Sequence, residues 1–139
     1  MSYILQTQTT SFKKELYEAV HNLSTDTIYI ALYTGDANLN ADTTAYSATN
    51  EVVASGYTAG GEALTGVAIS SSGYTAYVNW ANVSWTAAIT ARCALIYNVT
   101  QGNKSIAVID FGADKTSTTT FTITMPANTS TTALIRSSN

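Results

Sequence analysis

Apolar residues alternate with threonine and serine over long stretches of this chain, most clearly in STTTFTITM (117–125). Such alternation places one face of an extended segment in a core and the other face toward solvent. Threonine suits this arrangement, because its β-branched side chain stiffens a strand while its hydroxyl stays hydrated. Apolar residues make up 45% of the chain and charged residues only 11%, well below the roughly 25% of an average domain. The sequence therefore predicts a rigid β framework.

Strand-like segments are short and are separated by turns. They lie at 27–35, 62–70, 75–85, 90–98, 104–112, 117–125 and 130–136. The connection VTQGN (99–103) offers a glycine for positive φ and is typical of a hairpin. Short strands with frequent turns predict a mainly β fold, an antiparallel β-sandwich or barrel of about 7–8 strands with one N-terminal α-helix. Shared parity within the segments predicts core positions at Ile28, Ile30, Leu32, Val78, Trp80, Leu95, Ile106, Val108, Phe121 and Ile123.

One segment has helical periodicity. Its apolar face is formed by Phe12, Leu16, Ala19, Val20 and Leu23. Thr10 or Ser11 can cap the first turn, with Glu15 placed to complete a capping arrangement. The pattern predicts a helix over 11–22. The strand that follows, at 27–35, is apolar on both faces, so we expect it to be buried on both sides, under the helix.

The chain has 139 residues, which fits one domain. We expect an extended N-terminal arm over 1–10 and a single β-rich domain over 11–139. The arm is polar except for Tyr3, Ile4 and Leu5. Leaving three adjacent apolar side chains in water is unfavourable, so we expect them to be buried on the helix of the same subunit or on a neighbouring molecule. We favour the neighbour.

Candidate catalytic residues are few. His21, the only histidine, lies at the predicted helix end, where a structural role is expected. Cys93, the only cysteine, lies in the apolar run RCALIY, which favours a buried and inert thiol. One histidine and one cysteine cannot supply the three or four protein ligands of a zinc site. We therefore expect no catalytic residues, no metal and no cofactor, and we expect the protein not to be an enzyme.

The loop at 36–50 is long for a compact domain, and such loops are usually functional or form interfaces. Asp36, Asn38, Asn40 and Asp42 alternate in it like the oxygen ligands of a calcium loop. However, the glycine and the glutamate that an EF-hand needs at its sixth and twelfth positions are missing. Capping of the loop by these side chains is the expected role. Farther along the chain, Asp110 and Asp114 are candidates to pair with Arg92 or Lys115.

Partners are constrained by charge and by aromatic residues. The six Lys and Arg residues are scattered, so we expect no nucleic acid partner. No apolar run reaches the roughly 20 residues of a membrane span, and the N-terminus lacks the features of a signal peptide, so we expect synthesis in a cytoplasm. Tyr46, Tyr57 and Tyr74 lie in or beside loops, where each ring either docks on its own domain or anchors an interface. Tyrosine-rich β loops also suit sugar binding.

Several segments, taken in order, resemble a family of small virion proteins from tailed bacteriophages. They are SFKKELYEAVHNL (11–23), DTIYIALYT (26–34), TTAYSATNEVVASGYTAGGEALT (43–65), ARCALIYN (91–98), KSIAVIDFGADK (104–115) and ALIR (133–136). Together they cover most of the chain. The resemblance implies a non-enzymatic structural protein that is made in the host bacterial cytoplasm and becomes part of the virion.

Within that family, the expected role is a capsid decoration, or cement, protein. It would form a homo-oligomer, a trimer at three-fold positions, and would bridge subunits of the major capsid protein, stabilising the shell by binding only its assembled form. A tail, connector or fibre-associated structural protein is the alternative, and a receptor- or carbohydrate-binding module on the particle is a further one. The residues expected at a subunit or capsid interface are Tyr3, Ile4, Leu5, Tyr46 and Tyr57.

Overall fold

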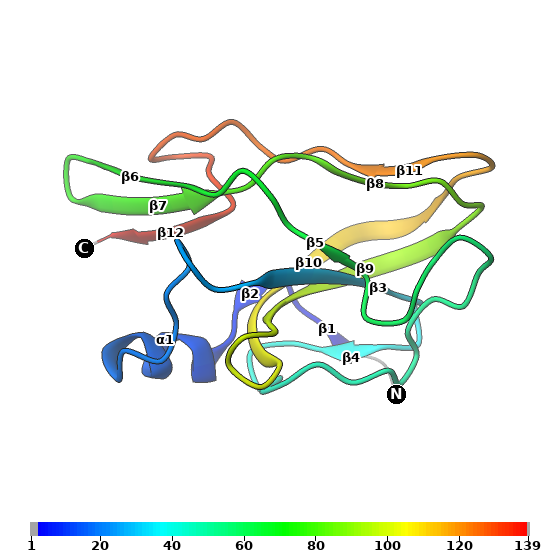
Figure 1. Cartoon of the computed structure of the whole chain (residues 1–139), viewed down its shortest axis with the longest axis horizontal. Helices are drawn as coiled ribbons and strands as arrows, with labels where there is room; N and C mark the ends of the chain where they lie inside the picture. Colours follow the sequence, from blue (N-terminus) through cyan, green and yellow to red (C-terminus); the bar gives the residue numbers. More distant parts are fainter. Residues whose placement is uncertain (1–2, 139) are drawn as a thin grey trace.

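The longest strands occur where both faces of the sequence are apolar, and they pair as one central sheet. The computed structural model describes residues 3–138. Its central sheet has the order β2-β10-β9-β3-β5 and is antiparallel throughout (Figure 1). The bounds are β2 Thr7–Gln8, β3 Ile28–Tyr33, β5 Glu62–Ala63, β9 Thr90–Asn98 and β10 Lys104–Thr116. The hairpin predicted at 99–103 joins β9 to β10.

A second layer covers one face of the central sheet. It consists of a three-stranded sheet, β12-β7-β6, and a two-stranded sheet, β11-β8, both antiparallel. This layer occupies the upper part of Figure 1. The bounds are β6 Ala68–Ser72, β7 Thr75–Asn79, β8 Val83–Trp85, β11 Phe121–Ile123 and β12 Ile135–Ser138. The main core lies between the layers, where Ile30 and Leu32 of β3 join Trp80, Trp85 and Phe121 in one cluster.

The opposite face of the central sheet is covered by the chain that follows β3. There β1 (Tyr3–Ile4) pairs in parallel with β4 (Asn38–Leu39). Tyr33, Cys93 and Leu95 from the sheet pack with Leu39 in a second buried cluster. The predicted burial of β3 on both sides is therefore confirmed. Its cover was predicted wrongly. The helix lies mainly against β10, and Ala37 and Leu39, in and beside β4, pack on β3 instead.

The predicted fold class is confirmed. The molecule is mainly β with one helix, its layers resemble a β-sandwich, and within residues 3–138 no sheet closes into a barrel. All the core positions predicted from parity are buried. Parity works here because the period-two pattern of a strand is set locally, whichever sheet the strand joins.

The helix is shorter than predicted. Helix α1 spans Thr10–Tyr17, and Thr9, rather than Thr10 or Ser11, caps it by accepting a hydrogen bond from the Phe12 N–H. Its end is a Schellman motif, in which Ala19 adopts a φ of 58° and the Val20 N–H reaches back to the Glu15 carbonyl. Helical periodicity continues past this point, and an alanine in the left-handed conformation gives no sequence signal.

Three predicted strands are placed or divided differently. The segment 62–70 divides between β5 in the central sheet and β6 in the second layer, and 75–85 divides into β7 and β8. Where the chain changes layer, Gly66 has a φ of 65° and the Ala81 N–H bonds the Thr65 carbonyl. The last strand is Ile135–Ser138 rather than 130–136, and it pairs with β7.

Candidate functional site

Glu51 carries a buried carboxylate that fastens the long loop to the central sheet. Its backbone forms a β-bridge with Tyr33 of β3. Its Oε1 accepts a hydrogen bond from the Tyr46 hydroxyl at 2.5 Å, and its Oε2 accepts one from the Tyr57 hydroxyl at 2.5 Å and one from the Gly60 N–H at 2.8 Å. No salt bridge reaches Glu51 within the described chain. Three donors therefore compensate the buried charge. We call Glu51, Tyr46, Tyr57 and Gly60 the Glu51 clasp.

Further tyrosines extend the clasp. The Tyr46 ring stacks on Tyr97 with centroids 4.8 Å apart, and the Tyr97 hydroxyl donates to the Gly60 carbonyl at 2.6 Å. The Tyr57 hydroxyl also accepts the Leu32 N–H at 2.9 Å, which ties it to β3. Burial, and next the hydrogen bond to Glu51, raise the pKa values of Tyr46 and Tyr57. Burial, and next the Glu51 charge, raise the pKa of Tyr97 to about 12. The three hydroxyls thus stay protonated, so Tyr46 and Tyr57 can donate to the Glu51 carboxylate and Tyr97 to the Gly60 carbonyl.

Tyr46 and Tyr57, two of the predicted interface residues, therefore dock on their own domain. This was one of the two roles left open for them. Tyr57 is buried and Tyr46 is half-buried, whereas Tyr74 is 86% exposed at the tip of the β6–β7 hairpin. A contact of Tyr46 or Tyr57 with a neighbouring molecule stays a prediction.

His21 belongs to a second buried polar network. Its Nε2 is 2.9 Å from the Glu15 carboxylate, and its Nδ1 is 3.0 Å from the Asn98 side-chain nitrogen. Asn98 also donates to Asp26 at 2.9 Å. Because Asn98 presents a donor to Nδ1, the network assigns the proton of a neutral imidazole to Nε2, which donates to Glu15. His21 was expected at the helix end but lies beyond it, because α1 ends at Tyr17. Its ring joins α1, through Glu15, to the end of β9, through Asn98.

Asp26 carries the charge at the far end of this network. Burial acts to raise the pKa of Asp26, but hydrogen bonds from the Asn22 N–H and from the Asn98 and Gln101 side chains outweigh it and lower the pKa overall. The ionised form of Asp26 is thus the form that the fold stabilises.

The remaining candidates have contacts within the subunit or are buried. Burial raises the pKa of the Cys93 thiol to about 12, in keeping with an inert group. Asp110 pairs with Arg92 at 3.3 Å. Asn40 caps its loop by accepting the Asp42 N–H at 2.9 Å.

Among residues 3–138, no three His, Cys, Asp or Glu side chains gather where they could hold a metal ion. In the same part of the chain, no helix has the length and apolar character needed to span a membrane.

The three N-terminal apolar residues differ in how far they are buried. Ile4 is half-buried against the cluster that includes Leu39. Tyr3 and Leu5 remain 56% and 41% exposed. Residues 3–8 lie extended and pair with β4 and β10 of their own chain. Burial of Tyr3 and Leu5 on a neighbouring molecule stays a prediction.

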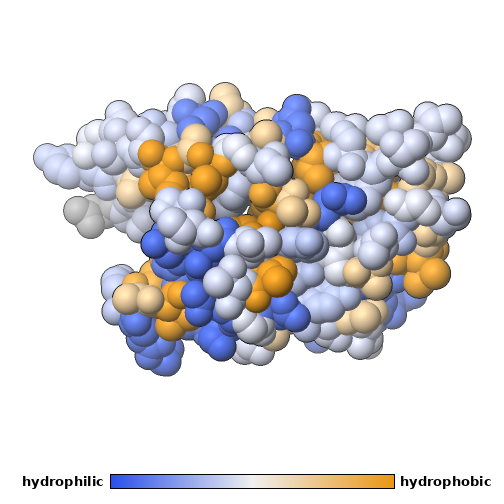
Figure 2. All heavy atoms as spheres, viewed as in Figure 1, coloured by the Kyte–Doolittle hydropathy of each residue, from blue (hydrophilic) through white to orange (hydrophobic). Residues whose placement is uncertain are grey.

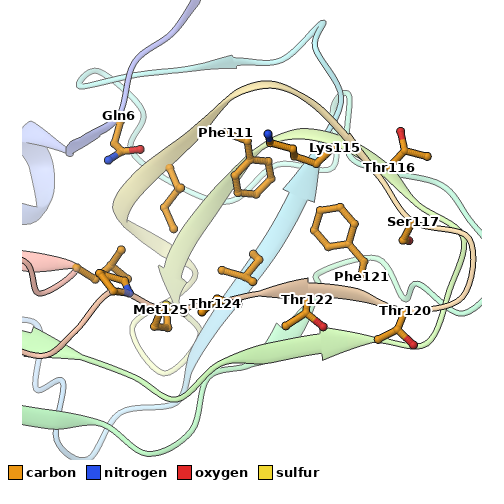
Figure 3. Close-up of a pocket in the computed structure, with 14 residues that line it drawn as sticks. Gln6, Phe111, Lys115, Thr116, Ser117, Thr120, Phe121, Thr122, Thr124 and Met125 are labelled. Carbon is orange, nitrogen blue, oxygen red and sulfur yellow. The ribbon is translucent and has the colours of Figure 1, made fainter.

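One cavity of about 590 Å³ opens between β10 and β11. Phe111 and Phe121 lie side by side in its lining, with ring centroids 6.2 Å apart and ring planes at 50° (Figure 3). Among the described residues that line it, Lys115 alone is charged. The hydroxyl of Ser117, on its rim, is used to bond the Ala87 carbonyl. The cavity therefore offers apolar contact and hydroxyl groups, with no pair of groups arranged for acid–base chemistry among its described residues.

Sequence reasoning missed the two networks. Glu51 and Asn98 are the residues at their centres. The sequence marks Glu51 only as an acidic residue that borders the long loop, and it gives no signal for Asn98. A usable signal for the clasp is the glycine pair that follows Tyr57, because Gly61 adopts a φ of 85° and a Cβ there would lie 1.8 Å from the Ile30 carbonyl oxygen. Such a close approach indicates that the segment is pressed onto the sheet.

No protein family, no characterised protein and no solved structure matches this chain. The function must therefore be argued from the chain's own residues.

Proposed function

We propose that this chain is a non-enzymatic structural protein of a tailed-bacteriophage particle, and that it is a capsid decoration protein. In this role, copies made in the host cytoplasm associate with each other and with the major capsid protein. They bind the assembled shell and not its free subunits, so binding stabilises the shell by mass action.

One observation carries the proposal: the buried carboxylate of Glu51 and the only histidine, His21, are both used to hold the fold together. Glu51 accepts three hydrogen bonds inside the subunit, and His21 bonds Glu15 and Asn98 with its side chain out of solvent. The TNEV and GYTAGG stretches that carry the resemblance to virion proteins contain Glu51, Tyr57 and Gly60 of the clasp. The resembling residues thus support a framework role.

The surface also favours contact with other proteins. Tyr17, Val53 and Tyr74 are 94%, 97% and 86% exposed, on three separate parts of the chain. Large apolar side chains in water favour association when a complementary surface is present, and tyrosine is enriched in such contacts.

The test is to mix the purified chain with shells and with tails of its phage, and to measure bound copies and shell stability. We expect the copy number to approach that of the major capsid protein and the shells to withstand a higher temperature. Two variants separate surface contact from folding. Tyr74→Ser changes an exposed side chain and should weaken binding to shells while leaving the fold intact. Tyr57→Phe changes the buried network and should lower the stability of the isolated subunit. Binding to tails alone, or to glycans and not to shells, would reject the decoration role.

A further inference from the structure

Strand β6 is an unprotected sheet edge. It is the outer strand of β12-β7-β6, and all five of its residues, AISSS, are exposed. Proteins usually guard such edges with Lys, Pro, a bulge or a very short strand. β6 contains neither Lys nor Pro, and its register with β7 runs without a shift from Ala68 to Ser72.

Other edges of the described molecule are guarded. β1, β2, β4 and β5 have two residues each, β8 and β11 have three each, and β5 contains Glu62. The outer edge of β10 is interrupted by an irregularity between Asp110 and Lys115. At β12, the side chain of Gln8 donates to the Arg136 carbonyl at 2.9 Å. These features set β6 apart as the edge that is free to pair.

The layer that contains β6 is almost free of charge. Residues 63–91 and 116–135 contain no Asp, Glu, Lys or Arg, so β6, β7, β8 and β11 carry none. Arg136 is the one charged residue in the strands of this layer. The chain has a net charge of −3, so two copies repel through the rest of their surfaces. At the uncharged β6 edge this repulsion is weakest, and together with the self-matching register described next it favours a second copy as the occupant.

The register also defines how two copies meet. β6 and β7 are joined by a two-residue turn in which Gly73 has a φ of 59°. In an antiparallel ladder that begins at such a turn, Ile69 and Ser71 direct their N–H and C=O groups away from β7. A two-fold axis at Ser70 then places Ile69 of one copy opposite Ser71 of the other, and the axis generates a second, equivalent pair. In each pair, the outward N–H of one residue faces the outward C=O of the other.

An apolar groove lies on the inner side of the same edge. A cavity of about 420 Å³ separates α1 from the β12-β7-β6 sheet and is lined by Phe12, Leu16, Leu23, Ile69, Val78 and Ile135, among others. Figure 2 shows apolar residues above and below this hollow, at the left end of the molecule. Ile69 is 55% exposed there. The pairing brings the two Ile69 side chains to diagonal positions on one face, where each shields part of the other from water.

We propose that two copies of this chain associate through β6, edge to edge and antiparallel around Ser70, to form a continuous six-stranded sheet. The contact rests on the proposed self-association of the chain, and not on its place in a particle.

The test uses the purified chain and three variants in sedimentation experiments across a concentration series. Ser70→Lys places two like charges opposite each other at the axis, and Ser71→Pro removes an outward N–H while sparing the ladder to β7. Thr25→Lys adds the same charge at an exposed site away from the layer. We expect Ser70→Lys and Ser71→Pro to weaken association at least about tenfold, and Thr25→Lys to leave it nearly unchanged.

Hydrogen exchange separates this contact from others. In the associated protein, the Ile69 and Ser71 amides should be protected, and in Ser70→Lys they should exchange rapidly with the remaining strands intact. A chain that stays monomeric at about 0.1 mM overturns the contact, as does an oligomer, such as a lone trimer, in which these amides exchange freely. A monomer that still decorates shells would reject the β6 contact and leave the proposed function standing.

Discussion

The hydroxyl of Tyr57 donates to the carboxylate of Glu51 at 2.5 Å, and both residues are buried. The same hydroxyl accepts the N–H of Leu32 in the middle of β3. Tyr57 thus connects a charged loop residue to the central sheet. Burial, and next the hydrogen bond to Glu51, raise the pKa of Tyr57, so the hydroxyl stays protonated and can donate to the carboxylate at neutral pH.

Replacing Tyr57 with Phe should destabilise the fold by about 1–3 kcal/mol, the usual cost of leaving buried polar groups unpaired. The variant removes a donor to Glu51 and leaves the Leu32 N–H without its partner. The measurement is the urea midpoint of unfolding at pH 7. Tyr74→Phe is the matched control, because its ring is exposed and its midpoint should not move. Equal midpoints for both variants would mean that the Tyr57 hydroxyl contributes nothing to stability.

Alanine substitutions at two glycines with positive φ can distinguish the cost of steric crowding from the cost of backbone strain. Gly61 has a φ of 85° and its Cβ would meet the Ile30 carbonyl, whereas Gly102 has a φ of 72° and nothing within 4 Å of its Cβ. We expect Gly102→Ala to cost about 1 kcal/mol from backbone strain alone. Gly61→Ala should cost about 3 kcal/mol or more, because the chain must also move away from β3. Thermal unfolding of the pair measures the difference, and similar losses would contradict the close approach.

The strands and the core could be predicted because their signals are local. Ile30, Leu32, Phe121 and Ile123 reveal their faces by alternation alone, and the strand pairing does not change that pattern. The β9–β10 hairpin was equally visible, because its turn residues lie together at 99–103.

The layers and the buried networks could not be predicted, because they depend on contacts between distant residues. His21 and Asn98 are 77 residues apart, and neither carries a motif. The chain changes layer between β5 and β6, where periodicity continues across the break. The end of the helix could not be predicted either. Ala19 is held in the left-handed conformation by the hydrogen bonds of the Schellman motif, and alanine has no preference of its own for that conformation.

The network at Asp26 makes stability sensitive to acid. Because the pKa of Asp26 is lowered in the fold, its contribution is present above the ordinary carboxyl value, about 3.9, and is lost as the pH falls through the lowered value. We expect the wild type to exceed Asp26→Asn in stability at pH 6, with the difference shrinking toward pH 3. Urea midpoints across this range measure it. Asp42→Asn, at an exposed aspartate, is the control; a difference that stays constant with pH would contradict the role of the Asp26 charge.

The N-terminal residues offer the last test, because one apolar side chain packs within the subunit and two are exposed for contact with other molecules. Ile4 packs on its own subunit, whereas Tyr3 and Leu5 are largely exposed. Ile4→Ser should therefore lower the free energy of unfolding by about 1–2 kcal/mol, as expected for a half-buried apolar side chain, and the urea midpoint should fall accordingly. The double variant Tyr3→Ser with Leu5→Ser should keep the wild-type midpoint and weaken attachment to shells, measured as bound copies per particle. Deletion of residues 1–6 should combine both effects while the rest of the fold persists. If the double variant decorates shells at full occupancy, Tyr3 and Leu5 are not the attachment, and the loop at 36–50 becomes the next surface to test.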